Sequence, residues 1–184
     1  MIDHVERIRG HFADSALLKQ EAAQTMAAPI ARAGALMTDC LFADGKILAC
    51  GNGGSASDAQ HFASELVNRF QRMRTAFAGI ALTTDTSVLT SIANDDSFER
   101  VFVRQIEALG RPGDVAVGIS TSGNSANVIA ALDYARRRQL VTIALAGPTP
   151  MVADVCVNVP AAITARIQEV HRTIIHVWCE LLEQ

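Results

Sequence analysis

The sequence predicts an α/β fold in which a parallel β-sheet is covered by helices on both faces, with additional helices at the N-terminus. Strand-like and helix-like segments alternate through the middle of the chain. The strand-like segments are continuous apolar runs, such as VAVGI at 115–119, which are typical of strands buried on both faces. The 184 residues are 49% apolar and 19% charged, which suits one globular domain spanning residues 1–184.

The N-terminal region, residues 2–43, is rich in alanine and repeats apolar residues every three or four positions, which predicts helix. Pro29 indicates a break between two helices near that point. A turn at Asp44-Gly45 then leads into the apolar run KILAC at 46–50, which we expect to be a short buried strand. A glycine-rich loop at 51–55 follows it.

The middle of the chain continues this alternation. Residues 56–70 carry a single apolar helical stripe, formed by Ala59, Phe62, Ala63 and Leu66. The apolar run at 79–82 predicts the second strand, and helical spacing follows at 86–92 and 98–109. A turn at Gly113-Asp114 then enters the third strand at 115–119.

The C-terminal part completes the pattern with a helix at 126–138, an apolar fourth strand at 141–146 and a weaker fifth strand at 154–159. A long helix at 163–183 closes the chain. Ligands of such sheets bind beyond the carboxyl ends of the strands. Two polar loops, 51–55 and 120–125, directly follow strands, so the pattern predicts a binding site where they meet.

Charge and composition exclude several classes of protein. The net charge of −3 and the pI near 5.9 leave no basic surface for a general nucleic-acid binder. No targeting segment and no run long enough to span a bilayer is visible, so we expect a cytoplasmic protein. The four cysteines are scattered without a C-x-x-C pair and are expected to be buried free thiols rather than disulfides or metal ligands; they are Cys40, Cys50, Cys156 and Cys179.

The loop STSGNS after the third strand suits an anion. A helix begins directly after it, and backbone N–H groups at a helix start are unpaired and carry the positive end of the helix dipole. Four side chains can donate O–H groups to a phosphate oxygen, namely Ser120, Thr121, Ser122 and Ser125. Gly123 permits a close approach or a positive φ. The alternative is ordinary helix capping by serine or asparagine.

The loop excludes one kind of phosphate site. It contains no lysine, and the sequence has no G-x-x-x-x-G-K-[ST] motif, so it is not the P-loop of a nucleotide-hydrolysing enzyme. A monophosphate on a small molecule fits better.

The glycine-rich loop, Asn52-Gly53-Gly54-Ser55, turns tightly into a helix and leaves its backbone open to a ligand, although many loops between a strand and a helix look like this. In the helix that follows, His61 and Glu65 are four residues apart and share a face. They are either a solvated pair or groups for metal ligation or acid–base catalysis.

Two further polar clusters have equally open interpretations. The last helix carries Gln168, His171 and His176 among apolar residues, and a histidine in such a setting is usually a packing residue. His176 lies eight residues after Gln168, which rotates the helix by about 80° and rises about 12 Å. The cluster at Asn94-Asp95-Asp96 is most simply the C-terminal turn of a helix.

Four motifs taken together resemble the sugar isomerase (SIS) domain family and, within it, the family of phosphoheptose isomerases. The motifs are CGNGGS…DAQHFASEL…NRF, ALTTDTSVLTSIAND, GISTSGNSANVI and RIQEVH…IIH, and they extend over nearly the whole chain. The resemblance implies a flavodoxin-like three-layer sandwich. It also implies a homotetramer with active sites between subunits, in which residues 2–43 serve oligomerisation.

The implied reaction converts D-sedoheptulose 7-phosphate to D-glycero-D-manno-heptose 7-phosphate through an enediol. It is the first step of ADP-heptose synthesis for the lipopolysaccharide core. An enediol route needs a base beside a C–H made acidic by a carbonyl, and a group that polarises or protonates the oxygens. It needs no organic cofactor.

The resemblance also assigns roles to residues. Glu65 matches the base and His176 the acid or partner base. The residues implied to bind the substrate are Asn52, Gly53, Gly54, Ser55, Glu65, Asn94, Asp95, Ser120, Thr121, Ser122, Ser125 and Gln168. The residues implied to bind one Zn²⁺ per subunit are His61, Glu65, Gln168 and His176, provided that Gln168 and His176 lean toward one point.

The chain departs from the family pattern at two places. Ala165 stands where an acidic residue often precedes the glutamine of the last helix, and the segment AGPTPMVADV after the fourth strand is short and lacks the usual glycine-rich loop. Either difference could alter turnover.

Two other functions compete with the isomerase. A non-enzymatic SIS protein that binds the replication initiator and promotes its assembly on DNA shares several motifs, but it lacks the residues equivalent to Glu65 and His176, which are both present here. A sugar-phosphate-sensing regulator would need a DNA-binding module, for which the chain has neither room nor basic surface.

Overall fold

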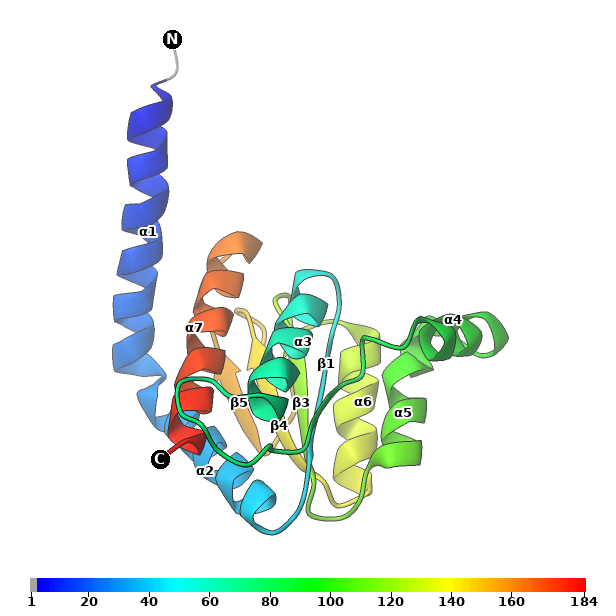
Figure 1. The fold of residues 1–184 in the computed structure, drawn as a ribbon. Helices are drawn as coiled ribbons and strands as arrows, with labels where there is room; N and C mark the ends of the chain where they lie inside the picture. The colour runs from blue at the N-terminus through cyan, green and yellow to red at the C-terminus, as the bar shows by residue number, and fades with distance from the viewer. Residues whose placement is uncertain (1–2) are drawn as a thin grey trace.

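A computed structural model describes residues 3–184 and contains a parallel five-stranded sheet between two layers of helices (Figure 1). The strands are β1 (Ile47–Gly51), β2 (Gly79–Ala81), β3 (Val115–Ser120), β4 (Val141–Ala146) and β5 (Val155–Asn158). The helices are α1 (His4–Thr25), α2 (Ala27–Phe42), α3 (Gly54–Val67), α4 (Thr86–Asp95), the 3₁₀ turn η1 (Phe98–Arg100), α5 (Val101–Leu109), α6 (Ala126–Arg137) and α7 (Thr164–Leu182). Residues 1 and 2, which the predicted domain includes, lie outside the described residues.

The sheet has the strand order β2-β1-β3-β4-β5, and every neighbouring pair is parallel. The chain moves outward from β1 to β2 and then returns to the other side of β1 to begin β3. The direction of winding therefore reverses between β1 and β3, and the loops that leave these two strands diverge to opposite faces. This topology confirms the predicted fold class and places a crevice at the carboxyl ends of β1 and β3.

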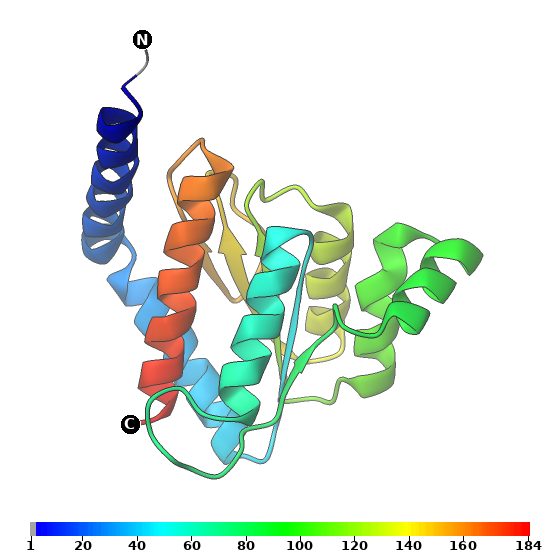
Figure 2. The ribbon, with the colours of Figure 1, turned by 45° about the horizontal axis from the view of Figure 1, so that its top comes forward.

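The two helical layers differ in size. Helices α2, α3 and α7 cover one face of the sheet, and α5 and α6 cover the other. Figure 2 shows α3 and α7 side by side across the front of the sheet, with α1 extending beyond the end of α7. Helix α4 packs on α5 and η1 at the edge of the molecule rather than on the sheet.

The core explains why the strands are apolar throughout. In β1, Ile47 and Ala49 face the layer of α2, α3 and α7, whereas Leu48 and Cys50 face the layer of α5 and α6. Successive side chains of a strand point to opposite faces, so a sheet covered on both sides needs apolar residues at every position. Trp178 is fully buried in the first layer, and its indole N–H donates to the Ile30 carbonyl at 3.0 Å.

The predicted break between two helices near Pro29 is present, at Met26, and Pro29 is the third residue of α2, where its missing N–H removes no helical hydrogen bond. Other element boundaries differ from prediction. Helix α3 begins at Gly54, so the end of the glycine-rich loop is already helical. Helix α4 extends to Asp95 and includes the Asn94-Asp95 pair.

All four cysteines are free thiols, and Cys40, Cys50 and Cys179 are buried as predicted. Cys156, which was also expected to be buried, is only partly buried because β5 is an edge strand of the sheet. Burial raises the pKa of the Cys50 thiol to about 12, so it stays protonated and unreactive at neutral pH. Among residues 3–184, no helix is both long enough and apolar enough to cross a membrane.

Glu183 fastens the segment that follows α3. Its carboxylate accepts hydrogen bonds from the backbone N–H groups of Phe70 at 2.7 Å and of Gln71 and Arg72 at 2.8 Å, and it pairs with Arg74 at 3.3 Å. Burial acts to raise the pKa of Glu183, but the three N–H groups and the Arg74 charge outweigh it and lower the pKa to about 2. The end of α7 therefore holds the 70–74 segment by a carboxylate that is ionised in the folded protein.

We predict that Glu183→Gln lowers the free energy of unfolding at pH 7 by about 1–3 kcal/mol, because charge-assisted hydrogen bonds are lost. The pKa is depressed from 4.5 to about 2 on folding, so this stabilisation is present above pH 4.5 and is lost as the pH falls toward 2. Urea unfolding of both proteins between pH 7 and pH 2.5 should show the two curves converging in acid. A constant difference across that range would contradict the assignment.

Candidate active site

The loops after β1 and β3 are joined by a pair of asparagine side chains. The Asn52 side-chain amide donates to Asn127 Oδ1 at 2.8 Å, and the Asn127 amide donates back to Asn52 Oδ1 at 2.9 Å. Asn127 lies in the first turn of α6 and is only 3% exposed. This reciprocal pair fixes the start of α6 against the glycine-rich loop, so that the two predicted binding loops form one surface.

Sequence reasoning missed Asn127. Its spacing in the sequence indicates that it is buried. Asn127 precedes Ala131 by four residues and Ala135 by eight, and both alanines are buried, so Asn127 belongs to the apolar stripe of α6. A polar residue in a buried stripe requires a partner.

The hydroxyl groups of the second loop gather around Ser120. Ser120 is the last residue of β3 and is buried, and its Oγ lies 2.8 Å from Ser125 Oγ and 3.3 Å from Ser122 Oγ. Ser125 occupies the N-cap position of α6, yet its hydroxyl makes no capping hydrogen bond to the helix. The capping alternative therefore does not describe Ser125. Gly123 has a φ of 69°, which agrees with the predicted conformation.

Helix α7 approaches the glycine-rich loop at Gln168. A Cβ atom on Gly54 would overlap the Gln168 side-chain amide, so glycine lets this amide lie directly against the start of α3. Gly54 and Gln168 line a hollow of about 490 Å³ together with the ion pair between Asp58 and Arg172, whose atoms are 2.8 Å apart. Ala165 also lines this hollow, so the departure from the family pattern lies beside the candidate site.

A second cluster lies further along α3 and α7. His61 Nε2 is 3.1 Å from Glu65 Oε1, and the His61 and His176 rings are 5.0 Å apart in an edge-on arrangement. Phe70 stacks on His176 with ring centroids 5.3 Å apart. Burial lowers the pKa of His176, the charge of His61 lowers it further, and Glu65 opposes both effects. A neutral imidazole beside a carboxylate can exchange protons with a bound ligand.

The four residues implied to bind zinc do not all meet within one subunit. Gln168 contacts Gly54 at the start of α3, whereas His176 lies beside His61, about 12 Å further along α7 by helical rise. Within residues 3–184, no three or more His, Cys, Asp or Glu side chains are arranged to hold a metal ion. His61, Glu65 and His176 are neighbours with suitable donor atoms, but His61 and Glu65 bond to each other.

Asn94 and Asp95 lie apart from both clusters. They are exposed at the end of α4, and the Asn94 side-chain amide donates to Asp95 Oδ1 at 2.8 Å. Figure 1 shows α4 beyond α5 and α6, on the opposite side of the molecule from α7. A single subunit therefore does not bring these two residues to the Glu65 cluster.

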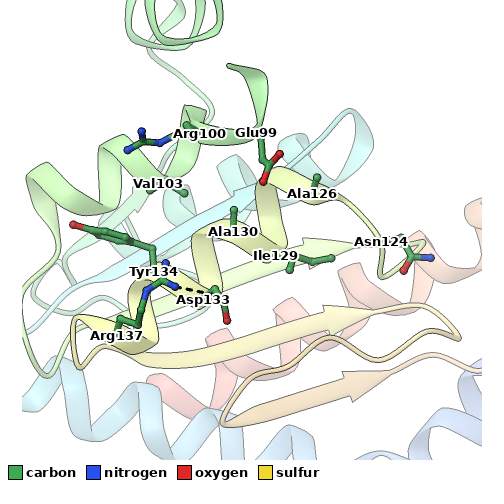
Figure 3. A pocket seen from close by; sticks show the side chains of 10 residues that line it. All are labelled: Glu99, Arg100, Val103, Asn124, Ala126, Ile129, Ala130, Asp133, Tyr134 and Arg137. Carbon is green, nitrogen blue, oxygen red and sulfur yellow. Dashed lines mark ion pairs between the residues drawn. The ribbon is translucent and has the colours of Figure 1, made fainter. Parts of the chain in front are cut away.

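A separate hollow of about 610 Å³ lies along the outer side of α6 (Figure 3). Of the predicted site residues, none lines it; its polar groups include Asn124, Tyr134 and the pair formed by Arg137 and Asp133, which are 3.9 Å apart. Its opposite charges offset each other, whereas the β1 and β3 loops present converging donors. We therefore place the candidate site at those loops.

Comparison with known proteins agrees with this architecture. Residues 11–147 match the family model of the SIS domain. A phosphoheptose isomerase of Neisseria meningitidis serogroup A is 53% identical over 185 residues, which cover 97% of this chain and 94% of that protein.

Two solved structures are similar over their whole length. The phosphoheptose isomerase from Neisseria gonorrhoeae is 50% identical with a TM-score of 0.91, and the alignment covers 98% of this chain and 99% of that one. The phosphoheptose isomerase from Francisella tularensis is 35% identical with a TM-score of 0.94 and full coverage of both chains.

We predict that Asn127→Asp destabilises the protein by about 1–3 kcal/mol, because the carboxylate cannot donate to Asn52 Oδ1 and leaves two acceptors facing each other in a buried site. Urea unfolding measures the loss. Asn124→Asp, the same change at an exposed position three residues before Asn127, is the matched control and should shift the free energy of unfolding by less than about 0.5 kcal/mol. Equal effects of the two changes would show that the amide pair does not fix the loops.

Proposed function

Because the chain belongs to the SIS domain family and, within it, to the phosphoheptose isomerases, we propose that it converts D-sedoheptulose 7-phosphate to D-glycero-D-manno-heptose 7-phosphate. The protein is an aldose–ketose isomerase that uses no organic cofactor. The observation that carries the site assignment is the convergence of the Ser120 hydroxyl cluster and the start of α6 at the β1/β3 crevice. In this assignment the reaction is the first step of ADP-heptose synthesis for the lipopolysaccharide core.

The phosphate end of the sugar is bound by the 120–125 loop. The hydroxyls of Ser120, Thr121, Ser122 and Ser125 donate to phosphate oxygens, and unpaired N–H groups of the first turn of α6 add to them. The glycine-rich loop, with Ser55 buried at the start of α3, lines the other side. This end of the substrate does not react, so its binding energy serves to position the sugar chain.

Proton transfer is assigned to the α3–α7 face. Glu65 removes a proton from C1 of the ketose, and the electron pair of that C–H bond forms the C1=C2 bond. In the same step His176, which its lowered pKa keeps neutral, accepts the proton of the C1 hydroxyl and passes it to the C2 oxygen, so that the ionised enediol forms. Glu65 then returns its proton to C2, and the electron pair on the C1 oxygen forms the aldehyde. Asn94, Asp95 and Gln168 complete the proposed substrate contacts.

One zinc ion per subunit is the proposed metal. His61, Glu65 and His176 supply the nitrogen and oxygen donors that zinc prefers, and Gln168 is the fourth proposed ligand. When bound, zinc would polarise the oxygens of the substrate. Because Gln168 and His176 are separated along α7, a ligand set that includes Gln168 fits a site shared between subunits.

We propose a homotetramer on two grounds. One is the site shared between subunits, and the other is the exposed apolar surface of α1. This helix of 22 residues buries only Ala22 and leaves apolar side chains exposed; Val5 and Ile8 are 56% exposed, Leu17 67% and Phe12 75%. An apolar stripe of this kind needs a partner, and a second copy of the chain supplies one. Residues 2–43 are thus assigned to assembly, within a single domain of residues 1–184, and active sites to the spaces between subunits.

The initiator-binding alternative is not favoured. The relatives that match nearly the whole chain are phosphoheptose isomerases, and Glu65 and His176, which the initiator-binding protein lacks, both lie beside His61. We place the reaction in the cytoplasm, where a phosphorylated sugar is retained.

The decisive experiment for the proposed reaction is incubation of the protein with D-sedoheptulose 7-phosphate in D₂O. We expect an aldoheptose 7-phosphate, detected by NMR and mass spectrometry, and any deuterium at C2 would report exchange of the Glu65 proton with solvent before its return. Absence of product would contradict the function.

We predict that Glu65→Gln reduces kcat at least about 100-fold, because the amide cannot take a proton at neutral pH. Glu180→Gln, a carboxylate change at an exposed position of α7, is the control and should leave kcat within about twofold of the unmodified protein. Zinc measured in the same samples separates the two roles, since loss of both zinc and rate would indicate ligation. A Glu65→Gln variant with nearly normal kcat would exclude both roles.

We predict a tetramer in analytical ultracentrifugation at micromolar concentration. Replacing exposed Phe12 of α1 by Glu should shift the population toward smaller species, because a charge then occupies an apolar interface. The activity should fall in parallel if the sites lie between subunits. A monomer of full activity would refute both the assembly and the shared site.

A further inference from the structure

His171 is a buried titratable group that the proposed chemistry does not use. It lies on α7 between Gln168 and His176, and its side chain is completely buried. Its Nε2 is 3.1 Å from the Ala146 carbonyl oxygen, which can only accept, so Nε2 carries the hydrogen. The Nδ1 atom is buried and finds no hydrogen-bond partner among residues 3–184. A single hydrogen bond thus compensates the burial of this ring.

The acceptor of that bond lies directly beside the phosphate loop. Ala146 is the last residue of β4, and its register partner on β3 is Ser120, the centre of the hydroxyl cluster. The Ala146 carbonyl also accepts from the Val159 N–H at 2.9 Å, and the Gly147 N–H lies 3.3 Å from the Ser120 carbonyl oxygen. The end of β4 is therefore fixed by β5 on one side and by His171 from the helical layer.

The residues that follow Ala146 pack directly against the 120–125 loop. A Cβ atom on Gly147 would overlap the Thr121 carbonyl, and a Cβ on Gly123 would overlap the Thr149 carbonyl. The segment 146–149 and the loop 120–125 are thus in van der Waals contact at two points. A displacement of the segment by a few tenths of an ångström must displace the loop, because packed backbone cannot be compressed.

We propose that His171 is a positioning residue for the phosphate site. Its Nε2–H bond to Ala146 fixes the position of the 146–149 segment against the 120–125 loop, and thereby the arrangement of the Ser120, Ser122 and Ser125 hydroxyls. The inference rests on the proposed function in assigning phosphate to this loop. His171 does not touch the substrate. It acts through backbone, and it ties the helix that carries Gln168 and His176 to the loop that binds the non-reacting end of the sugar.

The test compares two substitutions that differ in one hydrogen bond. In His171→Gln, the side-chain amide can place an N–H close to the position of Nε2 and should still donate to Ala146. In His171→Leu, the donor is absent. We expect His171→Leu to raise the KM for sedoheptulose 7-phosphate and the Kd for inorganic phosphate about tenfold, with kcat changed less than about threefold. His171→Gln should restore both constants to within about threefold.

Two further variants keep the test decisive. Ile175→Val removes one methylene group from the buried face of the same helix without touching Ala146, and it should leave the KM and the phosphate Kd unchanged. If His171→Leu does not fold, His171→Asn replaces it, because this shorter amide cannot reach the Ala146 carbonyl. If His171→Leu lowers kcat as strongly as it raises KM, or if His171→Gln does not restore binding, the positioning role is overturned.

The outcomes separate this inference from the function. If the unmodified protein isomerises the sugar phosphate while His171→Leu keeps its KM, the inference alone is wrong. If the protein binds inorganic phosphate but does not isomerise, the proposed reaction is wrong and the phosphate Kd of the variants still decides the inference. If it neither isomerises nor binds phosphate, both are wrong.

Discussion

The reversal of winding between β1 and β3 is the constraint on which the rest of the structure depends. It sends two loops to opposite faces of the sheet and leaves a crevice between them. The reciprocal amide bonds of Asn52 and Asn127 hold the two loops together, since each side chain satisfies the other in a buried position.

Helix α7 links binding to chemistry. Along α7 from its N-terminal end, Gln168 contacts the glycine-rich loop, His171 donates a hydrogen bond to the end of β4, and His176 lies beside His61. The carboxylate of Glu183 then holds the segment that carries Phe70, which stacks on His176. The residues that bind the phosphate end and those at the reacting end are thus both positioned by α7. A substrate of fixed length can therefore be aligned between the two groups of residues.

The sequence predicted most of the fold because its strands are buried on both faces and therefore appear as uninterrupted apolar runs. The positions of the 51–55 and 120–125 loops followed from that topology. Asn127 was missed because an amide in an apolar stripe reveals its partner only when the chain is folded. The grouping of Gln168 with His176 was predicted from resemblance, whereas in one subunit α7 separates them by more than two turns. The start of α3 was placed two residues too late because glycine has a low helix propensity, whereas Gly54 is the first residue of the helix.

The central claim is that the 120–125 loop holds the phosphate while the Glu65 cluster performs proton transfer. A crystal structure of the Glu65→Gln variant with sedoheptulose 7-phosphate tests it most directly, because the sugar should bind without turning over. The account predicts the phosphate within hydrogen-bonding distance of the Ser120 and Ser122 hydroxyls, with C1 and C2 directed toward residue 65 of the same or a neighbouring subunit. A phosphate bound instead in the hollow beside Tyr134 and Arg137 would contradict it.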